Sequence, residues 1–202
     1  MTRLGSNRSR KRVSSADALD GALIALDDLY REVDRGVRRL TEIHARRLRC
    51  RRGCSACCLD DLRVTRIEAE RIRRSHGDLL RRASPHAIGA CAFLDREGAC
   101  RIYADRPTVC RSQGLPLRVV FENESEEIEE RRDICSLNVE RGRALEALAE
   151  DDLWLVGPEE LRVQQLDEKA FGGGGDHESG GDGAGGSAKG LRMALRDLFR
   201  EP

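Results

Sequence analysis

Residues 50–58 read Cys50-Arg-Arg-Gly-Cys54-Ser-Ala-Cys57-Cys58, which places four thiols in one short loop. The chain contains four further cysteines: Cys91, Cys100, Cys110 and Cys135. Thiols at this density indicate a disulfide framework, a metal site or redox chemistry. The cysteine-rich stretch therefore decides which fold and which chemistry we expect.

The rest of the chain favours a metal over disulfides. Residues 1–15 are basic but lack the apolar segment of a secretory signal, and the chain has no run of about 18 apolar residues that would span a membrane. We therefore expect a cytoplasmic protein with no membrane partner. In that compartment thiols stay reduced, and structural disulfides are rare.

The composition predicts a small, mostly aliphatic core. Charged residues make up 36% of the 202 residues, and aromatic residues only 3%. Small domains often need a metal or disulfides to fold. A structural zinc contributes an apparent folding free energy of roughly 10–16 kcal/mol, against a typical net stability of about 5–15 kcal/mol. A bound metal would therefore determine whether the cysteine-rich part folds.

Charge is distributed unevenly, although the formal net charge is zero. Residues 44–82 contain twelve arginines and five acidic residues, a net charge of +7, whereas residues 122–133 contain seven acidic residues and two arginines, a net charge of −5. The positive stretch would partly offset the charge of metal-bound thiolates. Nucleic acid would also attract arginines, but no aromatic stacking platform or recognition module accompanies them, so we expect no nucleic-acid partner.

We predict a mainly α fold with a small β-hairpin and an irregular cysteine-rich metal-binding core. From residue 15 to about residue 47, apolar residues alternate steps of three and four, as on one long helix. These residues are Leu19, Leu23, Leu26, Tyr30, Val33, Val37 and Leu40. Such a heptad seam packs either against its own domain or against a second copy in a coiled coil.

Further helices and strands are predicted from helix-capping residues and from the alternation of apolar and polar residues. Thr65 and Glu68 form a capping box that opens a helix ending near residue 82, after a short extended piece at 61–64. Residues 91–113 predict loops with short pieces of structure. Residues 117–134 predict a β-hairpin. Helices are expected near 139–150 and 158–171.

Composition also sets the domain boundaries. We expect a disordered basic tail at 1–13, a cysteine-cluster domain at 14–171, a flexible linker at 172–190 and a short amphipathic helix at 191–202. The linker contains ten of the twenty glycines. Truncation after Phe171 should then leave the metal content unchanged. An unknown protein partner would bind through the N-terminal heptad helix or the C-terminal helix.

Thiolates are soft ligands that select zinc, copper(I) and iron–sulfur clusters. Cys54 and Cys57 form a C-x2-C pair, but no second pair of this kind occurs, so the pattern is not that of an ordinary zinc ribbon. Side chains of adjacent residues tend to diverge, which makes Cys57 and Cys58 poor ligands for the same single ion. Two ions or a multinuclear cluster could use both. Eight thiols divide into two sets of four, but the sequence does not choose the division.

Three further stretches extend the pattern: Val64-Thr-Arg-Ile-Glu68-Ala, Cys91-Ala-Phe-Leu, and Gly98-Ala-Cys100-Arg-Ile102-Tyr103-Ala-Asp-Arg106-Pro107-Thr-Val-Cys110-Arg111. Over residues 47–138 the chain resembles the CxxCxxCC family, described as zinc- or iron-chelating or as iron–sulfur-cluster-containing. The resemblance implies that the metal ligands are Cys50, Cys54, Cys57, Cys58, Cys91, Cys100, Cys110 and Cys135. One departure is that Cys135 is followed by Ser-Leu-Asn, where family members often have Pro or Gly.

Three residues near the last ligands are candidates for contacts around a cofactor. The guanidinium groups of Arg106 and Arg111 flank Cys110 and would offset thiolate charge and tune the reduction potential of a cluster. Tyr103 is either a core residue or a neighbour of the site.

Three functions are compatible with the sequence. The first, which we favour, is an iron–sulfur protein, with a 4Fe-4S cluster as one form, because eight thiols with a vicinal pair exceed the needs of one zinc. The second is a structural zinc module that acts as an interaction scaffold. The third is a group-transfer enzyme, since a related cysteine-cluster segment is associated with flagellin lysine methylation. No catalytic Ser/His/Asp grouping, dinucleotide fingerprint or methyl-donor motif is recognisable, so whether the protein is an enzyme stays open.

Overall fold

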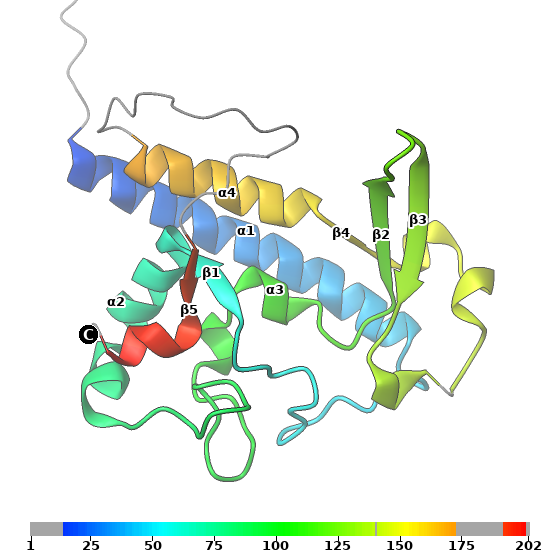
Figure 1. The fold of residues 1–202 in the computed structure, drawn as a ribbon, viewed down its shortest axis with the longest axis horizontal. Helices are drawn as coiled ribbons and strands as arrows, with labels where there is room; N and C mark the ends of the chain where they lie inside the picture. The colour runs from blue at the N-terminus through cyan, green and yellow to red at the C-terminus, as the bar shows by residue number, and fades with distance from the viewer. Residues whose placement is uncertain (1–13, 140, 173–191, 201–202) are drawn as a thin grey trace, which may run out of the picture.

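The computed structural model describes residues 14–139, 141–172 and 192–200. Two long helices, α1 (Ser15–Ile43) and α4 (Pro158–Phe171), lie side by side across one face (Figure 1). Helix α2 (Arg66–Arg82) and the short helix α3 (Thr108–Arg111) lie beneath this pair. The predicted fold class, mainly α with a small hairpin, is confirmed. The predicted basic tail and residues 173–190 of the predicted linker lie outside the described residues.

Helix α1 begins where Ser14 accepts a hydrogen bond from the backbone N–H of Asp17, an N-cap of the usual kind. The heptad residues Leu26, Tyr30, Val33 and Leu40 are buried, and they pack with residues of α4 and the strand before it. The seam therefore packs against its own domain. None of the helices in the described ranges is both long and apolar enough to cross a membrane.

In the part of the chain that the structure describes, five strands form two small sheets. Strands β2 (Leu117–Glu122) and β3 (Ile128–Asp133) are the predicted hairpin, and β4 (Trp154–Val156) adds parallel to β2. Trp154 packs against α1 at Gly36, where an added Cβ would lie 2.9 Å from the indole ring. The second sheet pairs β1 (Arg63–Thr65) with β5 (Arg192–Ala194), so the C-terminal segment returns to the start of α2 (Figure 1).

The N-terminus of α2 is the point at which the helices meet. The predicted capping box is present, and Glu68 is 5% exposed. One oxygen of its carboxylate accepts hydrogen bonds from the backbone N–H and the hydroxyl of Thr65. The other oxygen accepts from the Tyr30 hydroxyl on α1 at 3.2 Å and from the Thr108 backbone N–H on α3 at 2.9 Å. Asp167 of α4 accepts from the N–H of Ile67 at 2.8 Å. Two buried carboxylates thus join four helices.

The prediction of a helix near 139–150 is wrong. The described residues around it form 3₁₀ turns: η2 (Ser136–Asn138), η3 (Leu145–Ala147) and η4 (Glu150–Asp152). Gly142 has φ +91°, which breaks helical geometry. The carbonyls of Leu145, Glu146 and Leu148 accept from the Arg132 guanidinium of β3. A tertiary partner therefore takes acceptors that a helix would use for its own backbone.

The prediction of one helix over 191–202 is also wrong for the described residues. Residues 192–194 form β5, and η5 (Leu195–Phe199) is a 3₁₀ helix. An isolated helix of this length is marginal, whereas β1 offers an open edge for pairing. Leu195 and Leu198 are 2% and 0% exposed, and the Phe199 ring lies 5.0 Å from that of Phe93.

Arg196 in η5 holds two cysteine-bearing loops together. Its guanidinium binds the carboxylate of Asp60, which follows Cys58, and donates to the carbonyls of His86, Ala87 and Ala90, which precede Cys91. The C-terminal segment is therefore part of the domain core. This placement overturns the basis for expecting that truncation after Phe171 leaves the metal content unchanged.

Replacing Glu68 by alanine should destabilise the protein strongly. The substitution would leave the Tyr30 hydroxyl and the Thr108 N–H buried without an acceptor, at roughly 1–3 kcal/mol for each group. We expect the free energy of unfolding to fall by about 3 kcal/mol or more in urea denaturation. Glu70→Ala on the same helix removes a partly exposed pair with Arg74 and should change stability by less than about 0.5 kcal/mol. Equal effects of the two variants would contradict a central role for Glu68.

Removing the C-terminal segment should destabilise the domain and weaken metal retention. Leu198→Ala is expected to cost about 2–5 kcal/mol because Leu198 is fully buried, and truncation after Phe171 should cost at least as much. Leu161→Ala on α4 provides the control, since Leu161 is 56% exposed. Thermal unfolding and metal content measured on the same samples test this. Unchanged values in the truncated protein would show that β5 and η5 are dispensable.

Candidate metal centre

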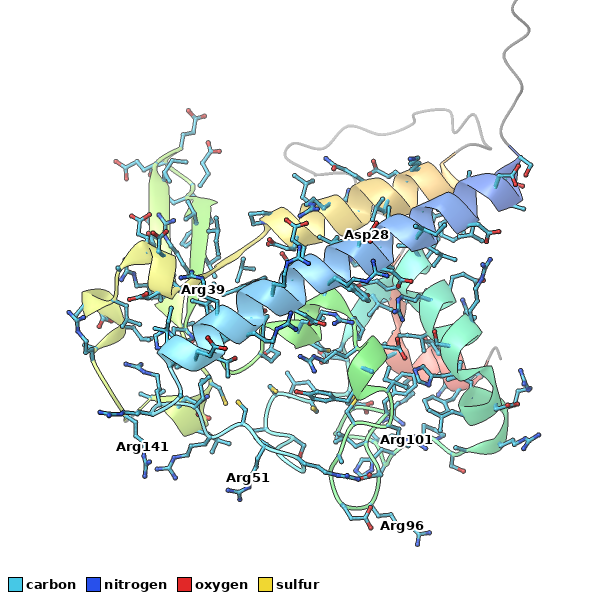
Figure 2. All side chains as sticks on the ribbon, turned by 180° about the vertical axis from the view of Figure 1, so that it is seen from behind. Asp28, Arg39, Arg51, Arg96, Arg101 and Arg141 are labelled. Atoms are coloured by element: carbon cyan, nitrogen blue, oxygen red, sulfur yellow. The ribbon has the colours of Figure 1, made fainter. Side chains whose placement is uncertain are left out.

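The eight cysteines, all free thiols, come from four segments far apart in the chain. Residues 50–58 join α1 to β1, Cys91 and Cys100 follow α2, Cys110 lies on α3, and Cys135 follows β3. All of them except Cys135 line one cavity of about 810 Å³. Figure 2 shows sulfur atoms gathered between the C-terminal half of α1 and the loops beneath it. The structure thus brings the predicted ligands to one region.

Two glycines allow the cysteine loop at 50–58 to pack closely on its neighbour. Gly53 and Gly98 have φ +82° and +76°, and a Cβ on Gly98 would lie 3.3 Å from the Gly53 carbonyl oxygen. Within the loop, Cys54 N–H donates to Arg51 O and Cys58 N–H donates to Ser55 O, both at 2.9 Å. These turns bend the loop around the cavity.

Cys50 lies in a cradle made by Gly114 and Asn138. A Cβ on Gly114 would lie 2.4 Å from the Cys50 sulfur, so only glycine leaves room for that sulfur. The side-chain amide of Asn138 donates to the same sulfur at 3.7 Å and accepts from the backbone N–H of Arg49. The backbone N–H of Asn138 donates to the carbonyl of Cys135. Sequence reasoning missed Asn138, because a single asparagine has no ligand spacing. The only hint was its place three residues after Cys135.

Three other thiols lie deeper. Cys91 is 8% exposed, and its N–H donates to the carbonyl of Cys58 at 2.9 Å. Cys100 pairs with Leu94 in an isolated β-bridge, which folds the 91–100 loop back on itself. Cys58, Cys91 and Cys100 belong to one hydrophobic cluster with Phe93.

Burial controls the charge state of Cys91, Cys100 and Cys110. It raises the pKa of Cys91, Cys100 and Cys110, and that of Cys110 reaches about 12 with a further contribution from neighbouring thiols. Metal binding must therefore displace protons that the folded protein holds tightly.

The vicinal pair corrects one expectation. We expected the side chains of Cys57 and Cys58 to diverge, but the two thiols interact closely enough to shift each other's pKa in opposite directions. The interaction with Cys58 is the largest cause that lowers the pKa of Cys57 to about 6, and a backbone hydrogen bond at Cys57 and the charge of Arg106 lower it further. The same interaction raises the pKa of Cys58. The physical reason is the turn closed by Cys58 N–H and Ser55 O, since alternation of side chains holds only along an extended strand.

The three residues predicted around the ligands have different positions. Arg106 and Tyr103 both line the cavity, and the guanidinium lies 4.1 Å above the tyrosine ring. The Nε of Arg106 is buried and has no hydrogen-bond partner in the described part of the chain. Arg111 also lines the cavity, but its guanidinium binds Asp34 of α1 at 2.8 Å and lies 3.8 Å from the Tyr30 ring. Arg106 is thus placed to act on thiolates, whereas the guanidinium of Arg111 anchors α3 to α1.

Other arginines near the cysteines also differ in position. Arg101 donates to the carbonyls of Ala92 and Phe93, between the two deeper thiols Cys91 and Cys100. Arg51 and Arg96 point away from the loops (Figure 2). The arginines near the cysteines therefore do not all direct their guanidinium groups at the same place.

The donor set fits a soft metal or a cluster. Soft thiol donors from three segments face a cavity whose walls include Phe93, Leu94 and Ile102. Within the described ranges, no three Cys, His, Asp or Glu side chains already converge on a single metal position. Ligation would require the thiols to turn toward a shared centre.

Comparison with known proteins agrees with this donor set. Residues 49–136 match the CxxCxxCC family, described as "Putative zinc- or iron-chelating domain". The resemblance is confirmed over this segment. Searches among curated proteins and among solved structures returned no match. The CxxCxxCC segment includes all eight cysteines and the cavity that seven of them line.

The metal-free protein should lose stability as the pH rises above about 9. Burial raises the pKa of Cys91, Cys100 and Cys110 above the ordinary value of 9.0, whereas the unfolded chain ionises near that value. The folded state therefore holds these protons more tightly, and its advantage is complete below pH 9 and lost as the pH approaches about 12. Metal-loaded protein should lack this decline, because the metal has already displaced the protons.

Urea denaturation under reducing conditions, with and without metal, measures this dependence between pH 9 and 11, above the range in which the lowered pKa of Cys57 has the opposite effect. A Cys110→Ala variant is the control and should show a shallower decline than the parent. A metal-free parent equally stable at pH 9 and 11 would refute the assignment of these thiols as buried and neutral.

Proposed function

We propose that the protein holds an iron–sulfur cluster through its cysteines. The observation that carries the proposal is the cavity of about 810 Å³ lined by every cysteine except Cys135. A tetrahedral zinc site places four ligand atoms about 2.3 Å from one ion and requires no surrounding space. A polynuclear cluster is a bulky group that must be enclosed, and seven thiols around a volume suit it better.

The surroundings of the cavity also suit a cluster. Hydrogen bonds to sulfur, burial and nearby charge are the means by which a protein tunes such a group. Asn138 donates to the Cys50 sulfur, Cys91 and Cys110 are held among buried residues, and Arg106 directs positive charge at Cys57. When bound, the cluster would supply one-electron transfer, usable in electron transport, sensing or catalysis.

A structural zinc module is the second candidate. Residues 44–62 contain no helix or strand beyond a turn, and they carry half of the cysteines. A metal that joins these residues to Cys91, Cys100 and Cys110 would stabilise loops that have little regular structure of their own. In that case the helical face of α1 and α4 is the surface on which we would look for a protein partner. Either metal requires reduced thiols, which favours a reducing compartment such as the cytoplasm.

Metal analysis of protein purified without oxygen and without an affinity metal tests the proposal. We expect iron with acid-labile sulfide and a broad visible absorption band. A double variant Cys57→Ser/Cys58→Ser should lose most of the band, whereas Ser55→Ala in the same loop should keep it. Colourless protein with stoichiometric zinc would overturn the iron–sulfur proposal and support the scaffold function.

A further inference from the structure

We propose that the eight cysteines form two adjacent four-thiol centres. The outer centre consists of Cys50, Cys54, Cys57 and Cys135. The inner centre consists of Cys58, Cys91, Cys100 and Cys110. The inference rests on the proposed function only in that the cysteines bind metal, and it holds for zinc as well as for iron–sulfur clusters.

The outer centre is built around Asn138. Its backbone N–H donates to Cys135 O at 2.8 Å, and its side chain donates to the Cys50 sulfur at 3.7 Å, so one buried residue joins these two cysteines across the domain. The thiols that interact electrostatically with Cys50 are those of Cys54, Cys57 and Cys135. The cysteines of this group come from two segments, and the Cys50 sulfur lies against Gly114.

The inner centre is built around Cys91. Its N–H donates to the Cys58 carbonyl, and Cys58 and Cys100 pack in the same hydrophobic cluster. Cys110 interacts electrostatically most with Cys91 and Cys100 and less with Cys57. Cys58 interacts with Cys91 and Cys110 as well as with its neighbour Cys57. These four sulfurs come from three segments and lie on the side of the cavity nearer to η5, whose Leu195 also lines it.

The vicinal pair marks the boundary between the centres. Cys57 belongs to the C-x2-C turn with Cys54, whereas the backbone of Cys58 is bonded to Cys91. Because the two sulfurs are neighbours, the two centres must be neighbours as well. Arg106 lies at this boundary, since its charge acts both on Cys57 of the outer centre and on Cys100 of the inner centre.

The two centres differ in access from solvent. Cys50 is exposed, whereas Cys91 is buried. The inner loops are closed by η5, where Arg196 holds residues 86–90 against Asp60. A chelator in solution should therefore remove metal from the outer centre first.

Stepwise chelation of the metal-loaded full-length chain tests the division. The protein, as purified or loaded with Zn²⁺ alone, is titrated with a chelator while iodoacetamide labels released thiols, and mass spectrometry reads each cysteine. We expect Cys50, Cys54, Cys57 and Cys135 to become labelled together as about half of the metal leaves, and the other four to follow together. Labelling of all eight at once, or of Cys57 and Cys58 in the same first group, would overturn the proposal.

A matched pair of glycine variants provides an independent arm. Gly114→Ala places a Cβ against the Cys50 sulfur, whereas Gly89→Ala has a similar positive φ but meets nothing within 4 Å. Gly114→Ala should lose about half of the metal and leave the inner four thiols protected, while Gly89→Ala should retain all of it. Complete loss in Gly114→Ala with retention in Gly89→Ala would indicate a single centre and overturn the division.

The two proposals fail in different ways. Zinc in place of iron overturns the iron–sulfur function and leaves the two labelling groups intact. Iron and sulfide with a single labelling group sustain the function and overturn the division. Thiols that are all labelled before any chelator is added would overturn both.

Discussion

The buried carboxylate of Glu68 is the constraint on which the rest of this structure depends. It caps its own helix through Thr65, and its other oxygen accepts from Tyr30 on α1 and from the backbone of Thr108 on α3. A carboxylate with only 5% exposure is tolerated because donors from three elements satisfy it. The geometry of these donors sets where α3 begins, and hence where Cys110 is presented.

The metal centre is assembled on this frame largely from irregular backbone. Loops have little stability of their own, so each cysteine-bearing segment needs a tertiary anchor. Asn138 anchors the segments of Cys50 and Cys135, Arg196 anchors those of Cys58 and Cys91, and Arg111 anchors α3 to α1. A bound metal would add covalent-strength links to the same segments. Hydrogen bonds and metal therefore stabilise the same arrangement, which explains how so modest an aliphatic core can suffice.

Local signals predicted the elements that local physics controls. The Thr65–Glu68 capping box, the seam from Leu19 to Leu40 and the helix that begins at Pro158 all appear as expected, because capping and amphipathic spacing act within a few residues. The helices predicted near 139–150 and at 191–202 fail for a shared reason. Arg132 takes the carbonyls of the first segment, and β1 takes the backbone of the second. Neither partner is near in the sequence.

The sequence by itself determined that this is a mainly helical, cysteine-cluster protein, because thiol spacing and helix periodicity are properties of short stretches. Only the tertiary structure decided which thiols of different segments are neighbours, and that Asp34 of α1 holds Arg111 while the charge of Arg106 acts on Cys57. These facts depend on contacts between segments separated by tens of residues. Burial and backbone approach at Gly114 and Asn138 determine such contacts, and no local pattern encodes them.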